Sequence, residues 1–316
     1  DLALRRLPLS RPLPPRFTGQ TLFVVEGPRR LAWRSQVLNV YDGRAWSLRP
    51  RGELERVTVI AGENEALLRA PEGVAFGSYK ETEEYRIHVL DDLGALLLRP
   101  ARTSTAIVPG RALFRDGQGN LYVRPGLAPP FTYQARVAVG PLLRRARPDP
   151  QDENLLQLPL LPERLRERVQ FLVAGCATPA EKIEALQQQL RQECAYVRQG
   201  YRLPAGADAT DHFLFEEKKG WCVHFASALA VMCRVAGIPS RVVTGYAPGD
   251  YDSLTGAARV TDTQAHAWTE AFLGSEGWTE YDPTPPGDSP LVPEEKRSPE
   301  AAPVMAHLSA SFKKLP

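Results

Sequence analysis

The distribution of hydrophobic and polar residues divides the chain into a strand-rich first half and a mixed second half. Between about Thr21 and Val139, hydrophobic residues alternate with polar ones or stand in short β-branched and aromatic runs, the pattern of half-buried strands. This pattern is carried by the segments TLFVV, RVTVIA, EYRIHVL and FTYQARVAV. VLNVY and RAWSL flank Asp42-Gly43, which is typical of a hairpin turn. The sequence therefore predicts an antiparallel β domain over residues 17–147, either a sandwich or a partly open barrel.

Helical periodicity begins after a second proline-rich stretch, from Pro148 to Pro162. Thr178-Pro179-Ala180-Glu181 is a capping box with proline at the first helical position, so a helix is expected to begin there. Hydrophobic residues recur at helical spacing in two stretches, Leu165, Val169 and Leu172 in the first and Ile183, Leu186, Leu190 and Cys194 in the second. Two amphipathic helices are predicted.

The run from Cys222 to about Ala236 is apolar nearly all round, as expected of a helix buried in the centre of a domain. Gly237-Ile238-Pro239 ends it, and residues 196–220 before it are expected to form a loop. The strand-like segments SRVVTGYA, AHAWTEAFL and GWTEYDP follow. The fold class predicted is therefore α+β, with a core over residues 148–286 in which a central helix packs against an antiparallel sheet.

Composition narrows the classes of function. A length of 316 residues suggests about two domains, and a net charge of +2 gives no argument for nucleic acid as a partner. No apolar run approaches the ~18 residues needed to cross a bilayer. The proline-rich stretches 1–16 and 287–316 are expected to be linkers.

The four cysteines form neither a CxxC pair nor a zinc-site spacing, so no metal and no cofactor is expected. Cys176 and Cys194 are expected at far ends of two antiparallel helices, which argues against a disulfide between them. Together with Cys233 they are interpreted as core residues.

Cys222 differs from the other cysteines because it stands where a loop meets the buried helix. A thiol at a helix N-terminus is close to the positive end of the backbone dipole, which favours the thiolate. His266 lies in the strand AHAWTEAFL, and a hairpin turn between Gly274 and Gly277 would bring Asp282 beside it. An imidazole next to a thiol can act as its base, and a carboxylate fixes the orientation of the ring. The sequence thus predicts a Cys222, His266 and Asp282 triad.

Four residues near the triad in sequence are candidates for supporting or structural roles. Trp221 and the backbone amide of Cys222 are candidates for an oxyanion hole. Trp268 falls on the same strand face as His266, so it either walls the acyl site or packs in the core. His212, in the loop before the nucleophile, is a candidate for the cleft. His224 is expected to be structural or part of a rim.

Three blocks, GWCVHFASALAVMCRVAGIPSRVVTGY, AHAWTEAF and GWTEYDPTPP, stand in the order found in the transglutaminase-like core, and the chain resembles that family over about residues 15–290. HFLFEEKKGWC and LNVYDGRAW resemble the bacterial membrane-anchored, TgpA-type members. The resemblance implies a papain-like core, with the nucleophile on the central helix and the histidine and aspartate on sheet strands. It also implies an extracytoplasmic (periplasmic or cell-surface) domain of an inner-membrane protein.

The chemistry expected of such a triad is acyl transfer through a thioester on Cys222. The donor would be a glutamine carboxamide of a protein or peptide, and the acceptor an amine such as lysine, with envelope proteins as the expected partners. Two alternatives stay open at this stage. The same triad suits a cell-envelope cysteine peptidase or amidase, and the fold alone suits a non-catalytic binding scaffold.

Overall fold

The computed structural model describes residues 6–10, 17–49, 54–57, 65–67, 81–108, 112–124, 128–139 and 153–285. The linker predicted over 287–316, the boundary predicted at 147/148 and the end of the segment RVTVIA lie outside these ranges. Within the stretch predicted as a linker over 1–16, Arg6–Pro8 form strand β1, which pairs with β5 (Ala45–Ser47). Leu9 follows and is 1% exposed. Residues 6–10 are therefore part of the fold, held by strand pairing and a buried side chain.

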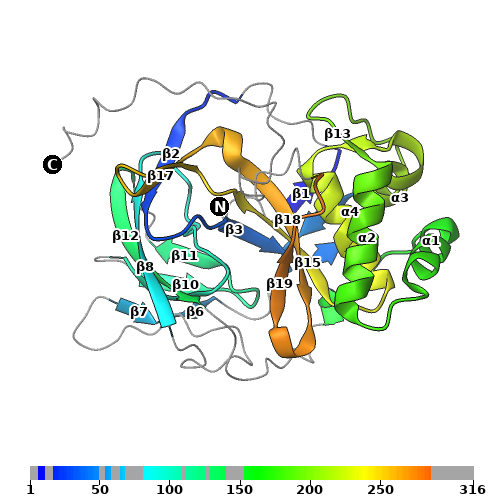
Figure 1. The fold of residues 1–316 in the computed structure, drawn as a ribbon, viewed down its shortest axis with the longest axis horizontal. Coiled ribbons are helices and arrows are strands. Elements are labelled where there is room, and N and C mark those ends of the chain that lie inside the picture. Colours follow the sequence, from blue (N-terminus) through cyan, green and yellow to red (C-terminus); the bar gives the residue numbers. More distant parts are fainter. Residues whose placement is uncertain are drawn as a thin grey trace.

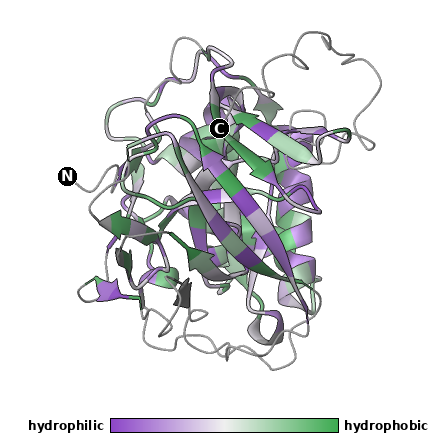
Figure 2. Cartoon of the chain, turned by 90° about the vertical axis from the view of Figure 1, so that its left-hand side faces the viewer, coloured by the Kyte–Doolittle hydropathy of each residue, from purple (hydrophilic) through white to green (hydrophobic). Residues whose placement is uncertain are grey.

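The first half forms two antiparallel sheets around one hydrophobic core (Figure 1). Its large sheet has seven strands in the order β16-β17-β2-β8-β12-β9-β7. Hydrophobic and polar residues alternate along its strands (Figure 2), and Tyr85, Ile87 and Val89 are the buried positions of β8. The first-half strands of these sheets are β2 (Thr21–Glu26), β7 (Glu65–Leu67), β8 (Glu81–Val89), β9 (Thr103–Ile107) and β12 (Phe131–Val139), with β6 (Glu55–Arg56), β10 (Ala112–Arg115) and β11 (Leu121–Arg124) in the smaller sheet.

The second half places helix α4 (Cys222–Val235) against a four-stranded antiparallel sheet, as predicted. The sheet order is β19-β18-β15-β3, from β19 (Trp278–Tyr281), β18 (Ala265–Phe272), β15 (Ser240–Tyr246) and β3 (Trp33–Leu38). Helices α1 (Glu163–Val173) and α2 (Pro179–Glu193) also pack on α4 (Figure 1). The predicted capping box is present, since Thr178 Oγ1 accepts from the amide of Glu181 at 3.2 Å.

Three strands join a sheet built mainly from the other half of the chain. β3 belongs to the first half of the sequence but pairs with β15 in the sheet behind α4. β17 (Ala257–Thr261) and β16 (Asp250–Asp252), from the second half, extend the large sheet through pairing of β17 with β2. The two sheets are thus built from both halves of the chain, and no single point in the sequence separates them.

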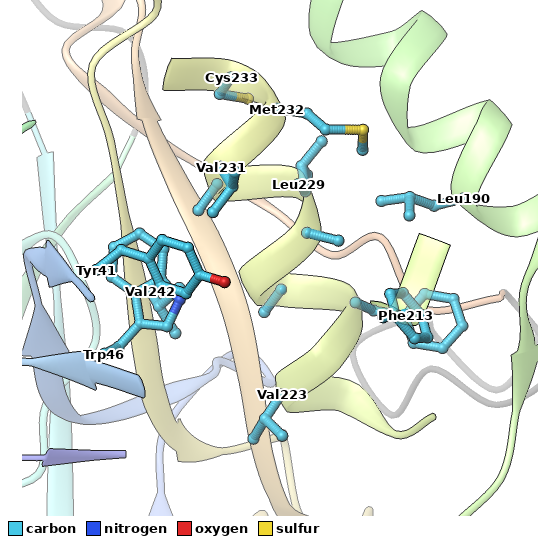
Figure 3. Close-up of a cluster of buried hydrophobic side chains, with 14 of the residues drawn as sticks. Tyr41, Trp46, Leu190, Phe213, Val223, Leu229, Val231, Met232, Cys233 and Val242 are labelled. Carbon is cyan, nitrogen blue, oxygen red and sulfur yellow. The ribbon is translucent and has the colours of Figure 1, made fainter. Parts of the chain in front are cut away.

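Helix α4 is buried from Cys222 to Arg234, and most of its side chains are apolar (Figure 3). Leu229, Val231 and Cys233 are each fully buried, and Ser240 Oγ donates to the carbonyl of Ala230 at 2.7 Å. Gly237, at φ +78°, ends the helix in the left-handed conformation that glycine adopts without strain. A helix in this position serves as the rigid centre of the domain.

The segment before α4 is more ordered than the predicted loop. Asp208 caps a short helix, α3 (Ala209–Asp211), by accepting from the amides of Thr210 and Asp211 at 2.9 Å. A π-helical turn, η2 (His212–Glu217), continues it, and two-residue strands β13 (Ala195–Tyr196) and β14 (Lys219–Gly220) pair in parallel. The loop prediction holds over 197–208 and is wrong over 209–220, because elements this short leave no periodic hydrophobic pattern.

Cys194 and Cys233 are core residues as predicted, whereas Cys176 is only partly buried and lies outside the core, so its interpretation as a core residue is wrong. Three aromatic residues of the first half are buried too: Trp33 lies in the core of the first half, while Tyr41 and Trp46, on either side of the Asp42-Gly43 turn of the β4 (Val40–Tyr41) and β5 hairpin, lie in the core around α4. All four cysteines are free. Cys176 and Cys194 flank the 15-residue helix α2, which at about 1.5 Å per residue separates them by roughly 22 Å.

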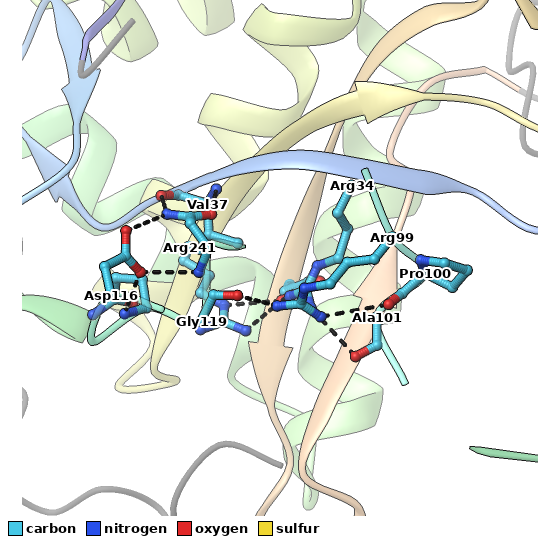
Figure 4. A network of polar contacts seen from close by, with 11 residues as sticks. Arg34, Val37, Arg99, Pro100, Ala101, Asp116, Gly119 and Arg241 are labelled. Atoms are coloured by element: carbon cyan, nitrogen blue, oxygen red, sulfur yellow. Dashed lines mark hydrogen bonds and ion pairs between the residues drawn. The ribbon is translucent and has the colours of Figure 1, made fainter. Parts of the chain in front are cut away.

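A buried ionic network joins the two halves (Figure 4). Glu270 on β18 accepts from Arg34 on β3 and from Arg241 Nε on β15, the latter at 2.8 Å, and all three side chains are nearly inaccessible to solvent. Burial raises the pKa of Glu270, but the two guanidinium groups outweigh it and hold the pKa below its usual value. Arg99 and Asp116 extend the network.

Replacing Glu270 with glutamine should destabilise the protein strongly. Both arginines would keep their buried charges without the carboxylate that balances them, and breaking a buried pair in this way costs about 3–5 kcal/mol. The free energy of unfolding in urea measures this loss, with Glu276→Gln in the exposed β18–β19 turn as the control. A loss below about 1 kcal/mol for Glu270→Gln would contradict the role given to the network.

Candidate functional site

Cys222 is the first residue of α4, and the short β13–β14 pair sets its position. Val197 donates from its amide to the carbonyl of Gly220 at 2.7 Å, which ties the entry of the helix to β13. Gly220 is required sterically, because a Cβ there would stand 2.9 Å from both His224 Nδ1 and the ring of Phe213. The chain consequently enters α4 tightly, and Cys222 lies at the positive end of the helix dipole.

His266 and Asp282 meet as the hairpin prediction requires. β18 and β19 pair in antiparallel with Thr269 opposite Tyr281, so Asp282 follows the last paired residue. His266 Nε2 lies 3.0 Å from Asp282 Oδ2. The other carboxylate oxygen, Oδ1, accepts from the amide of Thr284 at 3.0 Å. Both oxygens of Asp282 are thus engaged, and the carboxylate is fixed against the ring.

The thiol of Cys222 completes the group, because it lies close enough to His266 to act on the pKa of the ring. Since Nε2 of the ring faces Asp282, Nδ1 is the nitrogen left for the sulfur. Burial lowers the pKa of His266, but the charges of Asp282 and Cys222 and the hydrogen bonds to both outweigh it and raise the pKa to about 10. At neutral pH the ring is therefore an imidazolium between a carboxylate and the sulfur.

Tyr196 lies beside this group, although no sequence pattern predicted it. It pairs with Gly220, two residues before Cys222, and burial together with the charge of the nearby Cys222 raises the pKa of its hydroxyl above its usual value. The ring is half-buried and packs against Phe225 at 6.1 Å between centroids. A two-residue strand places Tyr196 here, and no sequence pattern marks so short an element.

Trp221 and His224 are engaged with each other rather than with the triad. The amide of Trp221 donates to His224 Nδ1 at 3.2 Å, and the two rings lie edge to face. His224 Nε2 lies 2.9 Å from the carbonyl of Leu9, so the ring is neutral with its proton on Nε2. Burial lowers the pKa of His224 to about 4 despite both hydrogen bonds. The contacts of His224 are those of a structural residue, and the backbone amide of Trp221 is engaged with its ring, while the Cys222 amide remains an oxyanion candidate.

Trp268 and His212 occupy different positions relative to the triad. Trp268 is fully buried with Val37 and Val243, and its ring stacks on His266 at 6.5 Å, so it packs in the core behind the histidine. His212 begins the π-helical turn, with Nε2 3.0 Å from the carbonyl of Arg202 and its ring against Tyr201. In its described contacts, His212 lies among these residues and not with Cys222.

Among the residues that the structure describes, no group of three or more histidine, cysteine, aspartate or glutamate side chains is arranged to hold a metal ion. In the same part of the chain, no helix is long and apolar enough to cross a membrane.

Part of the chain is similar to a known protein family. Residues 166–283, which include Cys222, His266 and Asp282, match the model of the transglutaminase-like superfamily. A Pseudomonas aeruginosa protein named protein-glutamine gamma-glutamyltransferase is 38% identical over 146 residues, which is 45% of this chain and 21% of that protein. Bacillus subtilis YebA is 35% identical over 139 residues, or 42% of this chain and 19% of its own. The chain thus spans about a fifth of the length of these curated relatives.

A solved structure extends the likeness to nearly the whole chain. The periplasmic domain of TgpA from Pseudomonas aeruginosa superposes with a TM-score of 0.67 and 22% sequence identity, covering 89% of this chain and 93% of that domain. Its form bound to ethylmercury gives a TM-score of 0.66. At this identity the comparison establishes the fold, which includes both the β-rich half and the helix-containing half.

Proposed function

Because residues 166–283 form a transglutaminase-like domain, we propose that this protein is a thiol acyltransferase that forms a thioester on Cys222 from a glutamine carboxamide and passes the acyl group to an amine. The observation that carries the proposal is the contact of His266 with both the Cys222 thiol and the Asp282 carboxylate. Such a triad could catalyse several reactions. Similarity to the Pseudomonas protein named protein-glutamine gamma-glutamyltransferase favours acyl transfer among them.

The first half-reaction forms the thioester. The Cys222 thiolate attacks the carboxamide carbon, and the carbonyl electrons move to oxygen. When the tetrahedral intermediate collapses, the carbon–nitrogen bond breaks and the nitrogen takes the proton of the His266 imidazolium, so that ammonia leaves. Asp282 stabilises the imidazolium before this transfer and holds the ring in position.

The second half-reaction transfers the acyl group. Neutral His266 takes a proton from the incoming amine as the amine nitrogen attacks the thioester carbon. The carbon–sulfur bond then breaks, which restores the thiolate and the imidazolium and releases an amide. If water replaces the amine, the same steps give a carboxylic acid. Transfer and hydrolysis therefore differ only in the acceptor.

Two donors near the sulfur are suited to stabilise the oxyanion. The amide of Cys222 is at the N-terminus of α4, and Tyr196 lies near it, because β13 pairs Tyr196 with Gly220 just before the helix. A carbonyl oxygen placed between them can accept from both, and these hydrogen bonds strengthen as the oxygen gains charge. We assign the oxyanion site to this pair.

Replacing Tyr196 with phenylalanine should lower kcat about 10²- to 10³-fold with little change in KM, because one donor to the developing oxyanion is lost. Steady-state kinetics with a glutamine peptide and an amine measures the effect. Tyr201→Phe is the matched control, since that hydroxyl donates to the carbonyl of Ala209. Parent-like kcat in Tyr196→Phe would remove Tyr196 from the oxyanion site.

Product analysis tests the proposed reaction. A glutamine-containing peptide is incubated with the protein, with and without a primary amine, and the products are identified by mass spectrometry. Amide formation that rises with amine concentration supports acyl transfer. A deamidated or cleaved peptide as the main product at every amine concentration would identify a hydrolase. Absence of any product, together with ordinary alkylation rates at Cys222, would identify a binding scaffold.

The cellular location is proposed from the similarity in fold to the periplasmic domain of TgpA. The similarity of fold to a periplasmic domain supports an extracytoplasmic location, as part of a membrane-anchored protein. Envelope proteins or peptides are then the candidate donors and acceptors, and neither a metal nor a cofactor is needed for the chemistry described.

A further inference from the structure

Helix α2 reaches the triad through the main chain of Asp282. Gln187 Nε2 donates to the carbonyl oxygen of Asp282 at 2.9 Å, and an Arg191 guanidinium nitrogen donates to the same oxygen at 2.6 Å. Gln187 and Arg191 are four residues apart, so they lie on one face of the helix. Two side chains from a separate element therefore converge on one backbone atom of the predicted orienting residue.

The helix that carries these two side chains is itself firmly placed. A complete capping box at Thr178 fixes its N-terminus, and Ile183, Leu186 and Leu190 bury its apolar face in the core around α4. Gln187 and Arg191 flank that face, which brings them to the edge of the helix beside Asp282. Because α2 is fixed against α4, its two side chains hold the backbone of Asp282 at a defined position relative to α4.

Asp282 requires support of this kind because it stands beyond the end of β19. Tyr281 is the last residue of the strand and pairs with Thr269, so the β18–β19 ladder does not extend to Asp282. Its carboxylate is held at Oδ1 by the amide of Thr284, only two residues away. The bonds from α2 connect its backbone to a distant part of the core.

We infer that Gln187 and Arg191 are positioning residues, which hold the main chain of Asp282 so that its carboxylate stays in contact with His266. This inference rests on the proposed function for its effect on catalysis, but its structural part concerns the contact between Asp282 and His266 alone.

The two side chains act on His266 in ways that can be separated. Moving the carboxylate away from the ring weakens the attraction that stabilises the imidazolium, which lowers the pKa of His266. Arg191 also carries a positive charge, and removing that charge would by itself raise the pKa of His266. Gln187 is neutral, so the effect of Gln187→Ala reports position only. A lowered pKa in both variants is the signature of positioning.

The test combines an NMR titration with kinetics on the whole protein. The histidine ring resonances are followed with pH in the parent, Gln187→Ala, Arg191→Ala and the double variant. Exposed positions on the same helix provide the controls Gln188→Ala and Gln192→Ala. We expect the pKa of His266 to fall in both single variants and further in the double variant. We expect kcat to fall about ten- to hundredfold with KM nearly unchanged, the loss typical of a small misplacement in a catalytic group.

The outcomes distinguish this inference from the proposed function. If the pKa of His266 is raised in the parent and is the same in the Gln187 and Arg191 variants, the positioning role is wrong. If the variants lose only thermal stability, with kcat and the pKa as in the parent, the contacts are structural and the inference is likewise overturned. If His266 of the parent itself titrates near its ordinary pKa of about 6.5, the ion pair fails first, and with it the proposed mechanism.

Discussion

Replacing Cys222 with alanine is expected to lower kcat/KM for acyl transfer by more than about a thousandfold, as removal of a covalent nucleophile generally does. The sulfur is the atom that would hold the acyl group, and no other described thiol can take its place. Cys194 and Cys233 are buried, and burial raises the pKa of each to about 12, which keeps both as neutral thiols. Activity is measured as amine incorporation into a glutamine peptide.

Two controls make the result interpretable. Cys176→Ala removes the partly exposed thiol that follows α1 and should leave activity unchanged. The thermal midpoint of Cys222→Ala should remain close to that of the parent, because the substitution removes one sulfur atom at the start of α4. Activity of Cys222→Ala equal to that of the parent would refute the triad.

Replacing Asp282 with asparagine is expected to reduce kcat by orders of magnitude, up to about 10⁴-fold, while leaving a measurable residue of activity. His266→Ala should be more damaging, because the ring itself moves the proton. The amide of asparagine keeps the shape of the side chain at 3.0 Å from His266 Nε2 but removes its charge. The loss therefore reports the electrostatic role of Asp282.

The pH–rate profile shows in which direction Asp282→Asn shifts the pKa of His266. In the parent, Asp282 contributes to raising the pKa of His266 to about 10, and activity should fall on the alkaline side as the imidazolium loses its proton. Without the carboxylate the pKa is lower, so the alkaline limb of the pH–rate profile should move to lower pH. An unchanged limb together with full activity would mean that another residue orients His266.

The parts of the fold that the sequence predicted are those with strong local patterns. The uniformly apolar run from Cys222 marks α4 because a helix without a polar face must be buried. The alternation in FTYQARVAV corresponds to β12, and the capping box at Thr178 begins α2. His266 and Asp282 could be placed together because a short turn joins their two strands.

The parts that the sequence did not predict depend on contacts between distant residues. Nothing local shows that β3 joins the sheet behind α4, or that β16 and β17 extend the large sheet, because strand order is decided by tertiary packing. Tyr196 enters the site through a two-residue strand, and Gln187 and Arg191 reach Asp282 from the polar edge of a helix. A glutamine or arginine on an exposed helix edge is ordinary in sequence, and only the fold shows which atom it binds.

The most direct test of the account is to isolate the covalent intermediate. The protein is incubated with a glutamine peptide in the absence of amines, quenched in acid, and measured as an intact mass before digestion locates the modified residue. The account predicts a mass increase equal to the peptide less one ammonia, located on Cys222, lost on addition of a primary amine and absent from Cys222→Ala. Turnover of the peptide with no adduct on Cys222, or with the same adduct in Cys222→Ala, would contradict it.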